Sequence, residues 1–305
     1  MRTIQLGKSD LQVPVIAVGC MRLNGLDKVA AENFIRTAID NGANFFDHAD
    51  IYGGGTCEEI FSEAIQMNSE IREKIMLQSK CGIAPGRFDF SKEHILSSVD
   101  GILKRLKTEY LDVLLLHRPD ALVEPEEVAE AFDQLQQSGK VRNFGVSNQN
   151  PMQMQLLQNS VKQPIIANQL QLSITNANMI TQGLHVNMLD DGAVNRDGSV
   201  LDFCRLNSIT VQPWSPFQYG FFEGVFLENE KYPELNKKID EIAAKYEVSN
   251  TTIAMAWLLR HPAKMQPVTG TMNTSRLLEC IKATEVTISR EEWYEIYLSA
   301  GNILP

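Results

Sequence analysis

Residues 30–47 read Ala-Ala-Glu-Asn-Phe-Ile-Arg-Thr-Ala-Ile-Asp-Asn-Gly-Ala-Asn-Phe-Phe-Asp, and this stretch contains one complete helix-to-strand unit. Apolar residues recur every three or four positions from Ala30 to Ile39, which predicts a helix with one buried face. Gly42 is a typical helix stop, because glycine accepts the left-handed backbone that ends many helices. The run Asn44–Asp47 that follows is typical of a short buried strand.

The same alternation recurs along the whole chain. Short apolar runs alternate with longer segments of helical period, which is the pattern of βαβ units and a parallel sheet. The runs are Val15–Val18, Asn44–Asp47, Ile75–Ser79, Leu111–Leu116, Phe144–Ser147, Ile165–Asn168, Ile209–Trp214 and a short one near Gln266–Thr269. Eight such runs favour a closed (β/α)8 barrel, the TIM barrel of the α/β class, over an open sheet.

Helix and turn signals support this division. Ser91 precedes one apolar stripe as a candidate cap, and Pro125 and Gly139 bracket another stripe. Thr3–Leu6 and Leu11–Pro14 predict an N-terminal β-hairpin, which we expect to close the floor of the barrel.

One segment breaks the rhythm. Ser173–Ser199 is rich in Asn, Gly and Asp and has little periodicity. Long irregular segments in compact domains are usually functional, so we expect this one to form a wall of the substrate pocket. A disordered excursion is the alternative interpretation.

Composition limits the class of protein. The chain has 305 residues, which fits one barrel domain over residues 1–305, and a formal net charge of −10, which argues against nucleic acid or an anionic membrane as a partner. No stretch approaches the ~20 apolar residues of a membrane span, and the start has no signal-peptide core. We expect a cytoplasmic protein that acts on a small molecule. Its cysteines, which we expect to be free thiols, are Cys20, Cys57, Cys81, Cys204 and Cys280.

Four polar side chains stand at or just after the ends of successive apolar runs. Asp47 ends the second run and Tyr52 follows it, Lys80 follows the third run, and His117 follows the fourth. The active site of such a barrel lies at the carboxyl ends of the strands, so closure would bring these side chains together. Each alone has a structural explanation, as a cap, a packed aromatic, a surface lysine or a core histidine. Their joint occurrence favours a catalytic set.

These residue types suit proton transfer to a carbonyl group. The ordinary pKa of tyrosine is about 10, and a nearby ammonium favours the phenolate, so we expect Lys80 to lower the pKa of Tyr52. Asp47 would keep Lys80 charged by pairing with it. Tyr52 then serves as the general acid, and His117 orients the carbonyl and donates to the developing oxyanion.

Three segments resemble motifs of the aldo-keto reductase family. They are Asn44–Gly53, Asp112–Pro119 and Gly139–Asn148, and they occur in the family's order. The first is most similar to the YdhF-like bacterial branch, in which a histidine follows the catalytic aspartate. The resemblance implies reduction of an aldehyde or ketone to an alcohol by hydride transfer from NADPH. It assigns catalysis to Asp47, Tyr52, Lys80 and His117.

The resemblance also implies where NADPH binds. The chain has no Gly-x-Gly-x-x-Gly fingerprint, so a separate dinucleotide-binding domain is not expected. Family members bind NADPH across the mouth of the barrel instead. The match assigns the nicotinamide carboxamide to Ser147, Asn148 and Gln169, the face of the nicotinamide ring to Trp214, and the pyrophosphate to Ser215 and Phe217.

The segment after the eighth run is the predicted phosphate end. Gly270 and Thr271 lead into a helix whose free N–H groups attract anions, and barrels often hold phosphate at this place. The planar guanidinium of Arg276 suits a 2′-phosphate, which favours NADPH over NADH. Glu279 matches the family's adenine contact. Cys280 replaces the common asparagine, so weaker adenine contacts are expected.

Three other functions remain open on the sequence alone. A metal-dependent hydrolase would use Asp47, His48 and Asp50 with His117, although the chain has no His-x-His pair. A lyase would form a Schiff base on Lys80, which pairing with Asp47 would oppose. A sensor would bind NADPH and report it to a partner without turnover.

Overall fold

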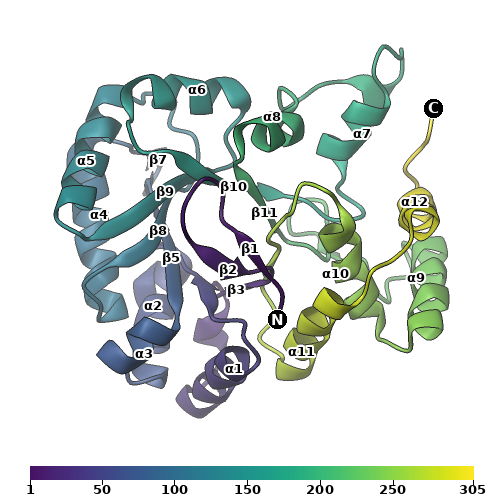
Figure 1. Cartoon of the computed structure of the whole chain (residues 1–305), viewed down its shortest axis with the longest axis horizontal. Coiled ribbons are helices and arrows are strands. Elements are labelled where there is room, and N and C mark those ends of the chain that lie inside the picture. The colour runs from purple at the N-terminus through teal and green to yellow at the C-terminus, as the bar shows by residue number, and fades with distance from the viewer.

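The computed structural model describes residues 1–305, and eight of its strands form one parallel sheet (Figure 1). Around the sheet the order is β11-β10-β9-β8-β5-β4-β3-β14. Every one of the predicted apolar runs contributes a strand to it. The strands are β3 (Ala17–Gly19), β4 (Phe45–Asp47), β5 (Met76–Cys81), β8 (Leu111–Leu116), β9 (Val141–Ser147), β10 (Ile165–Gln171), β11 (Thr210–Trp214) and β14 (Val268–Thr269).

The two end strands of this order meet and close the barrel. The backbone N–H of Gln266, just before β14, donates to the carbonyl of Val211 in β11 over 3.1 Å. The side chain of Gln212 donates to Gln266 Oε1 over 2.9 Å. The prediction of a (β/α)8 barrel is therefore confirmed.

An N-terminal hairpin, β1 (Thr3–Gln5) and β2 (Gln12–Pro14), lies across one end of the barrel (Figure 1). Leu6, in its turn, is fully buried among the inward-facing side chains of the strands. Gly7 has a φ of +56°, and a Cβ there would lie 2.2 Å from the carbonyl oxygen of Ile166. Only glycine permits so close an approach, so the hairpin closes the floor of the barrel as predicted.

Helices cover the outer side of the sheet (Figure 1). Ser91 Oγ accepts the backbone N–H of His94 over 3.3 Å at the start of α4, and Pro125 opens α5, as the sequence predicts. The helices are α1 (Lys28–Asp40), α2 (Thr56–Ala64), α3 (Ser69–Lys74), α4 (Lys92–Leu106), α5 (Pro125–Gln137), α6 (Pro151–Ser160), α7 (Asn178–Leu184), α8 (Val200–Asn207), α9 (Pro233–Tyr246), α10 (Asn250–Arg260), α11 (Thr274–Lys282) and α12 (Arg290–Ser299).

Two small hairpins extend loops that follow barrel strands. β6 (Ile83–Ala84) pairs with β7 (Arg87–Phe88) after β5, and β12 (Gln218–Tyr219) pairs with β13 (Gly224–Val225) after β11. Both loops therefore leave the carboxyl end of the barrel. Short 3-10 helices lie at Leu23–Gly25, Tyr52–Gly55, Asp191–Ala193 and Ala283–Glu285.

The prediction for Ser173–Ser199 was wrong in its main point. The segment contains α7, and none of its residues lines the large cavity at the carboxyl end of the barrel. It lies beside the C-terminal segment instead (Figure 1), where His185 Nε2 is 2.9 Å from the carbonyl oxygen of Ile303. Near its start, Ser173 Oγ donates to the carbonyl of Gln218 over 2.7 Å, so the segment props the loop after β11 from outside the cavity.

Two features concern the whole chain. All five cysteines are buried and none forms a disulfide, which agrees with the expected free thiols. No helix has the length and apolar character that a membrane span requires.

Candidate active site

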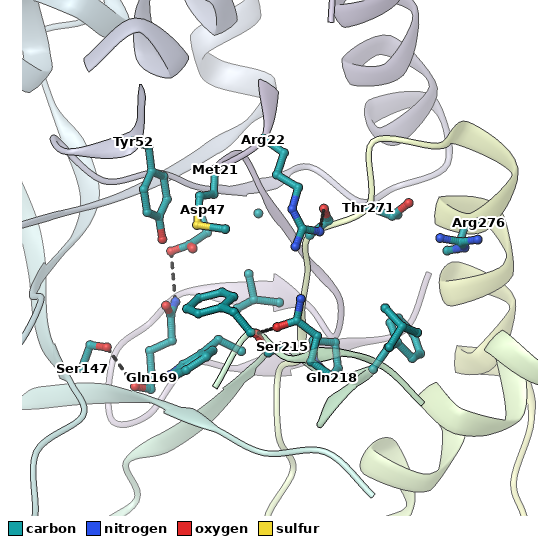
Figure 2. Close-up of a pocket in the computed structure, with 18 of the residues that line it drawn as sticks. Met21, Arg22, Asp47, Tyr52, Ser147, Gln169, Ser215, Gln218, Thr271 and Arg276 are labelled. Carbon is teal, nitrogen blue, oxygen red and sulfur yellow. Dashed lines mark hydrogen bonds between the residues drawn. The ribbon is translucent and has the colours of Figure 1, made fainter. Parts of the chain in front are cut away.

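A cavity of about 490 Å³ opens at the carboxyl ends of the strands, and 28 residues line it. Figure 2 shows Tyr52, Asp47, Gln169 and Ser147 at one end and Arg276 at the other, with Ser215 between them. The cavity is therefore elongated and contains residues from both the predicted catalytic set and the predicted cofactor set.

The ammonium of Lys80 is the centre of the catalytic end. Its Nζ lies 2.8 Å from Asp47 Oδ2, 2.8 Å from the carbonyl oxygen of His48 and 3.1 Å from the hydroxyl oxygen of Tyr52. An ammonium has three N–H donors, and these contacts use all of them. Lys80 is fully buried beneath the cavity, so its charge is compensated entirely by the protein.

Asp47 is held by amide side chains as well as by Lys80. Its Oδ1 accepts from Gln78 Nε2 over 2.6 Å and from Gln169 Nε2 over 3.1 Å. Gln212 joins the two glutamines, since its Oε1 accepts from Gln78 over 3.0 Å and from Gln169 over 3.3 Å. Strands β5, β10 and β11 thus orient the carboxylate through a buried amide cluster, which we call the glutamine cluster (Gln78, Gln169, Gln212).

A glycine turn positions Tyr52. The three glycines at positions 53–55 have φ values of +59°, +65° and +96°, a left-handed path that other residues rarely follow. A Cβ on Gly53 would lie 2.5 Å from Thr56 Oγ1. The turn leads from the half-buried Tyr52 into α2, and the phenol is left at the cavity with its oxygen toward Lys80.

The expected pKa shift of Tyr52 was wrong in direction. Burial raises the pKa of the Tyr52 phenol, and the ammonium of Lys80 lowers it only in part. For Lys80, burial favours the neutral amine, but Asp47 and Tyr52 outweigh burial and raise the pKa of Lys80. The sequence pattern predicted the ammonium of Lys80 beside Tyr52, but it did not predict how deeply the phenol is buried. The resulting state is a neutral phenol beside a charged lysine, which is the state that a proton donor requires.

His117 completes the predicted set. Its ring centroid lies 6.0 Å from that of Tyr52, at 83° to it, and the residue lines the cavity. Burial, together with the charges of Lys80 and Arg118, lowers the pKa of His117 well below its ordinary value. Nδ1 is buried without a partner. His117 is therefore a neutral imidazole, which has one N–H donor and one acceptor nitrogen.

Amide and hydroxyl groups lie beside Asp47 in the cavity (Figure 2). Asn148 Nδ2 donates to Ser147 Oγ over 2.7 Å, and Ser147 Oγ donates to the carbonyl of Gln169 over 2.9 Å. Gln169 Nε2 donates to Asp47 and to Gln212, whereas Gln169 Oε1 accepts no hydrogen bond from the protein. Ser147, Asn148 and Gln169, the three predicted carboxamide contacts, therefore lie together and leave one amide oxygen free.

The loop after β11 supplies the aromatic wall. Trp214 Nε1 donates to Asn148 Oδ1 over 3.2 Å, and the Phe222 ring stacks on Trp214 at 5.8 Å between centroids. Ser215 and Asn148, the first residues after β11 and β9, have φ values of +53° and +57°. For residues with a Cβ this conformation costs roughly 1–2 kcal/mol, and such strain is concentrated at functional sites. Ser215 and Phe217, the predicted pyrophosphate contacts, also line the cavity.

The far end of the cavity carries two arginines. Gly270, Thr271 and Arg276, the predicted phosphate contacts, line it, and Arg276 has no acidic partner. Arg22, which the sequence analysis missed, donates to the carbonyl of Gly270 over 3.3 Å (Figure 2). It follows the end of β3 by three residues, so the strand-end rule that found the catalytic set could have found it.

Glu279, the predicted adenine contact, and Cys280, which replaces the family's common asparagine, lie outside the cavity lining. Glu279 is half-buried, and its carbonyl accepts from Thr252 Oγ1 over 2.9 Å. Cys280 is fully buried, its Sγ lies 3.6 Å from Thr269 Oγ1, and burial raises the pKa of its thiol to about 12. The adenine contact assigned to Glu279 stays a prediction, as do the weaker adenine contacts expected because Cys280 replaces an asparagine.

A second polar layer lies behind Lys80. The backbone N–H of Asp50 donates to the carbonyl of Lys80 over 3.1 Å. Burial and the nearby Glu58 raise the pKa of Asp50 to about 6. Glu58 itself accepts from Ser79 Oγ and from Arg105 Nε, each over 2.7 Å. Asp50 is therefore a half-buried carboxyl that ionises near neutral pH.

The geometry bears on the two catalytic alternatives. No three His, Cys, Asp or Glu side chains are grouped so that they could hold a metal ion. His48 packs edge-on to Phe61 at 4.6 Å, and burial and Lys80 lower its pKa to about 3. For a lyase, Lys80 would have to be an unprotonated nucleophile, but its nitrogen makes three hydrogen bonds and its pKa is raised.

Comparison with known proteins adds independent findings. Residues 15–297 match the model of the Aldo/keto reductase family. The chain is 34% identical to the oxidoreductase YdhF of Escherichia coli (strain K12), over 88% of this chain and 86% of that one. It is 35% identical to a 6-dehydroglucose reductase of Agrobacterium fabrum, over 87% and 86%. A crystal structure of the thermostable aldo-keto reductase Tm1743 with the inhibitor epalrestat is 27% identical, with a TM-score of 0.77 over 98% of this chain and all of that one.

Proposed function

The chain belongs to the aldo/keto reductase family and is an NADPH-dependent oxidoreductase of carbonyl compounds, and we propose that Asp47, Tyr52, Lys80 and His117 carry out the reduction. One observation carries the assignment: a single buried ammonium is hydrogen-bonded both to Asp47 and to the hydroxyl of Tyr52, at a cavity long enough to have a separate cationic end.

Tyr52 is the proton donor. Its oxygen accepts from Lys80, so its own O–H remains free to donate into the cavity. Its raised pKa keeps the proton in place at neutral pH until negative charge develops on the substrate oxygen. The ammonium of Lys80 then stabilises the phenolate, and Asp47 holds that ammonium in place. Because His117 is neutral, it orients the carbonyl by a hydrogen bond without competing as an acid.

The remaining lining fits NADPH. Ser147, Asn148 and Gln169 offer amide and hydroxyl groups for a carboxamide, Trp214 offers an aromatic face, and Arg276 offers a guanidinium for a phosphate. When bound, NADPH supplies the hydride from C4 of its nicotinamide ring. Ser147, Asn148, Gln169 and Trp214 would hold that ring in the cavity that Tyr52 also lines.

The relatives bear on the substrate. The Agrobacterium relative reduces 6-dehydroglucose, by its name, which supports an oxygen-rich aldehyde or ketone here.

We further propose that the protein acts in the cytoplasm, which its five buried and unpaired cysteines support.

The test is oxidation of NADPH, followed at 340 nm, with a panel of aldehydes, ketones and oxidised sugars. We expect turnover of at least one carbonyl class, and Tyr52→Phe should lower kcat by ~10²–10⁴-fold because it removes the acid catalyst. NADPH affinity, measured by calorimetry, should stay within a few-fold. A sensor would bind NADPH and turn over none of the panel, and full activity of Tyr52→Phe would contradict the assigned role.

A further inference from the structure

Arg118 differs from the other shielded arginines of the chain. Four arginines are buried or half-buried, namely Arg72, Arg105, Arg118 and Arg260. Arg72 pairs with Asp112 at 2.7 Å, Arg105 pairs with Glu58 at 2.7 Å, and Arg260 donates to the carbonyl of Ile288 over 2.9 Å. The guanidinium of Arg118 makes no hydrogen bond or ion pair with any residue of the chain.

Arg118 lies at the catalytic end of the cavity. It follows His117 directly, both residues line the cavity, and the charge of Arg118 helps to lower the pKa of His117. Its Cζ is 5.8 Å from the ring centroid of Trp214 and 6.0 Å from that of Phe221. These aromatic contacts restrain the guanidinium plane but leave its N–H donors unused.

No acid near Arg118 balances its charge. The acidic residues of the cavity lining are Asp47, which is paired with Lys80, and Glu228, which lies near Asn250 on another loop. Asp120, two residues after Arg118, is used by the backbone N–H groups of Phe90 and Leu122. Burial lowers the pKa of Arg118, as expected for a cation with water partly removed and no anion in its place.

We propose that Arg118 determines substrate specificity, by donating two parallel hydrogen bonds to a pair of neighbouring oxygens on the part of the substrate away from its carbonyl. The chemistry fits a carboxylate or a vicinal diol, because both present two acceptor oxygens to the planar fork. This inference rests on the proposed carbonyl reduction and narrows it to oxygen-rich substrates. An unpaired, half-buried guanidinium is costly in an enzyme for purely apolar aldehydes, since nothing in the pocket would satisfy its donors.

Three aldehydes of similar shape test the proposal: benzaldehyde, 4-carboxybenzaldehyde and 3,4-dihydroxybenzaldehyde. The readout is kcat/KM with NADPH for each of the two substituted aldehydes, divided by kcat/KM for benzaldehyde. This division removes the effect of general damage to the pocket, because such damage lowers kcat/KM for all three aldehydes together. The variants are Arg118→Gln, which removes the charge, and Arg118→Lys, which keeps the charge without the planar fork.

In the unmodified protein we expect at least one ratio above about 10, and Arg118→Gln should lower it by about 10- to 100-fold, the range for a lost hydrogen bond to a charged group. The ratio for Arg118→Lys should lie between that of the unmodified protein and that of Arg118→Gln. A lower carboxylate ratio identifies an anionic substrate, and a lower diol ratio identifies a sugar-like one. If both ratios change less than threefold in Arg118→Gln, the proposal is overturned. A tenfold loss of NADPH affinity with unchanged ratios also overturns it, because Arg118 would then bind the cofactor.

A binding measurement separates this proposal from the proposed reaction. Calorimetry on the complex with NADP+ compares benzoate and catechol with benzyl alcohol, in the unmodified protein and in Arg118→Gln. If no aldehyde is reduced, the proposed reaction fails. The role of Arg118 still stands if benzoate or catechol binds at least tenfold more tightly than benzyl alcohol and Arg118→Gln removes that preference. Equal binding of all three overturns it.

Discussion

The positive charges at the two ends of the cavity are compensated in different ways. At the catalytic end, Lys80 is fully buried, its three donors are used, and strands position it. At the other end, which we propose binds phosphate, Arg276 is exposed, has no acidic partner and stands in the first turn of a helix after a loop. Both are cations, but Lys80 lies beneath the cavity and Arg276 lines it. One is compensated by the protein itself, and the other is left for a ligand to compensate.

The difference follows from what each end has to do. Proton transfer needs the phenol of Tyr52 and its partners fixed before the substrate arrives, and a buried network provides that order. Binding a phosphate needs a charge that the phosphate can reach, and a neighbouring carboxylate would compete for it. A positively charged side chain can thus stabilise the fold at one end and remain available to a ligand at the other.

The largest expected effect contrasts the two cations directly. Lys80→Met leaves the buried carboxylate of Asp47 without its counter-charge and should lower the free energy of unfolding by about 3–5 kcal/mol. Arg276→Met changes an exposed side chain and should lower it by less than about 0.5 kcal/mol. Urea unfolding followed by fluorescence measures both. The double variant Asp47→Asn with Lys80→Met should recover much of the loss, and a Lys80→Met protein as stable as the unmodified one would refute the contrast.

The next effect concerns the phosphate end. Arg276→Ala should weaken NADPH binding by about 10- to 100-fold, because it removes a charged hydrogen-bond partner of the 2′-phosphate. NADH, which lacks that phosphate, should lose less than about threefold. Titration of the two cofactors by fluorescence or calorimetry gives both dissociation constants. Arg276→Lys should retain part of the NADPH preference, and equal losses for NADPH and NADH would place Arg276 away from the 2′-phosphate.

The smallest effect concerns the layer behind Lys80. The pKa of Asp50 is raised from 3.8 to about 6, so the folded protein binds this proton more tightly than the unfolded chain does. Stability therefore falls as pH rises from about 4 to about 6, by roughly 1–2 kcal/mol after allowance for partial exposure, and levels off above that window. Asp50→Asn should abolish this component. The check is urea unfolding of both proteins at pH 4, 5, 6 and 7, and parallel pH profiles would rule out the assigned shift.

The periodicity of the chain predicted its architecture well because that information is local. The helix-to-strand unit at residues 30–47 needed only the spacing of apolar residues and one glycine. The strand-end rule located Asp47, Lys80 and His117 for the same reason, since carboxyl ends of parallel strands meet at one face of the barrel. That rule was not applied to the first strand, which is why Arg22 was missed.

The glutamine cluster shows where pattern reasoning stopped. Gln78, Gln169 and Gln212 stand in strands far apart in sequence, and only barrel closure brings their side chains to one carboxylate. The prediction for Ser173–Ser199 was wrong for the opposite reason. Its composition suggested a functional loop, but its contacts are with the C-terminal segment and with the back of another loop.

The sequence by itself determined the class of fold, the sites where strands end and the types of residue placed there, since these depend on near neighbours along the chain. Tertiary structure alone decided that the phenol keeps its proton, that a lysine with no surface exposure stays charged, and that Arg118 has no partner. The reason is physical: the energy of a charge depends on how much water surrounds it and on which distant groups replace that water, and neither can be known before the barrel closes.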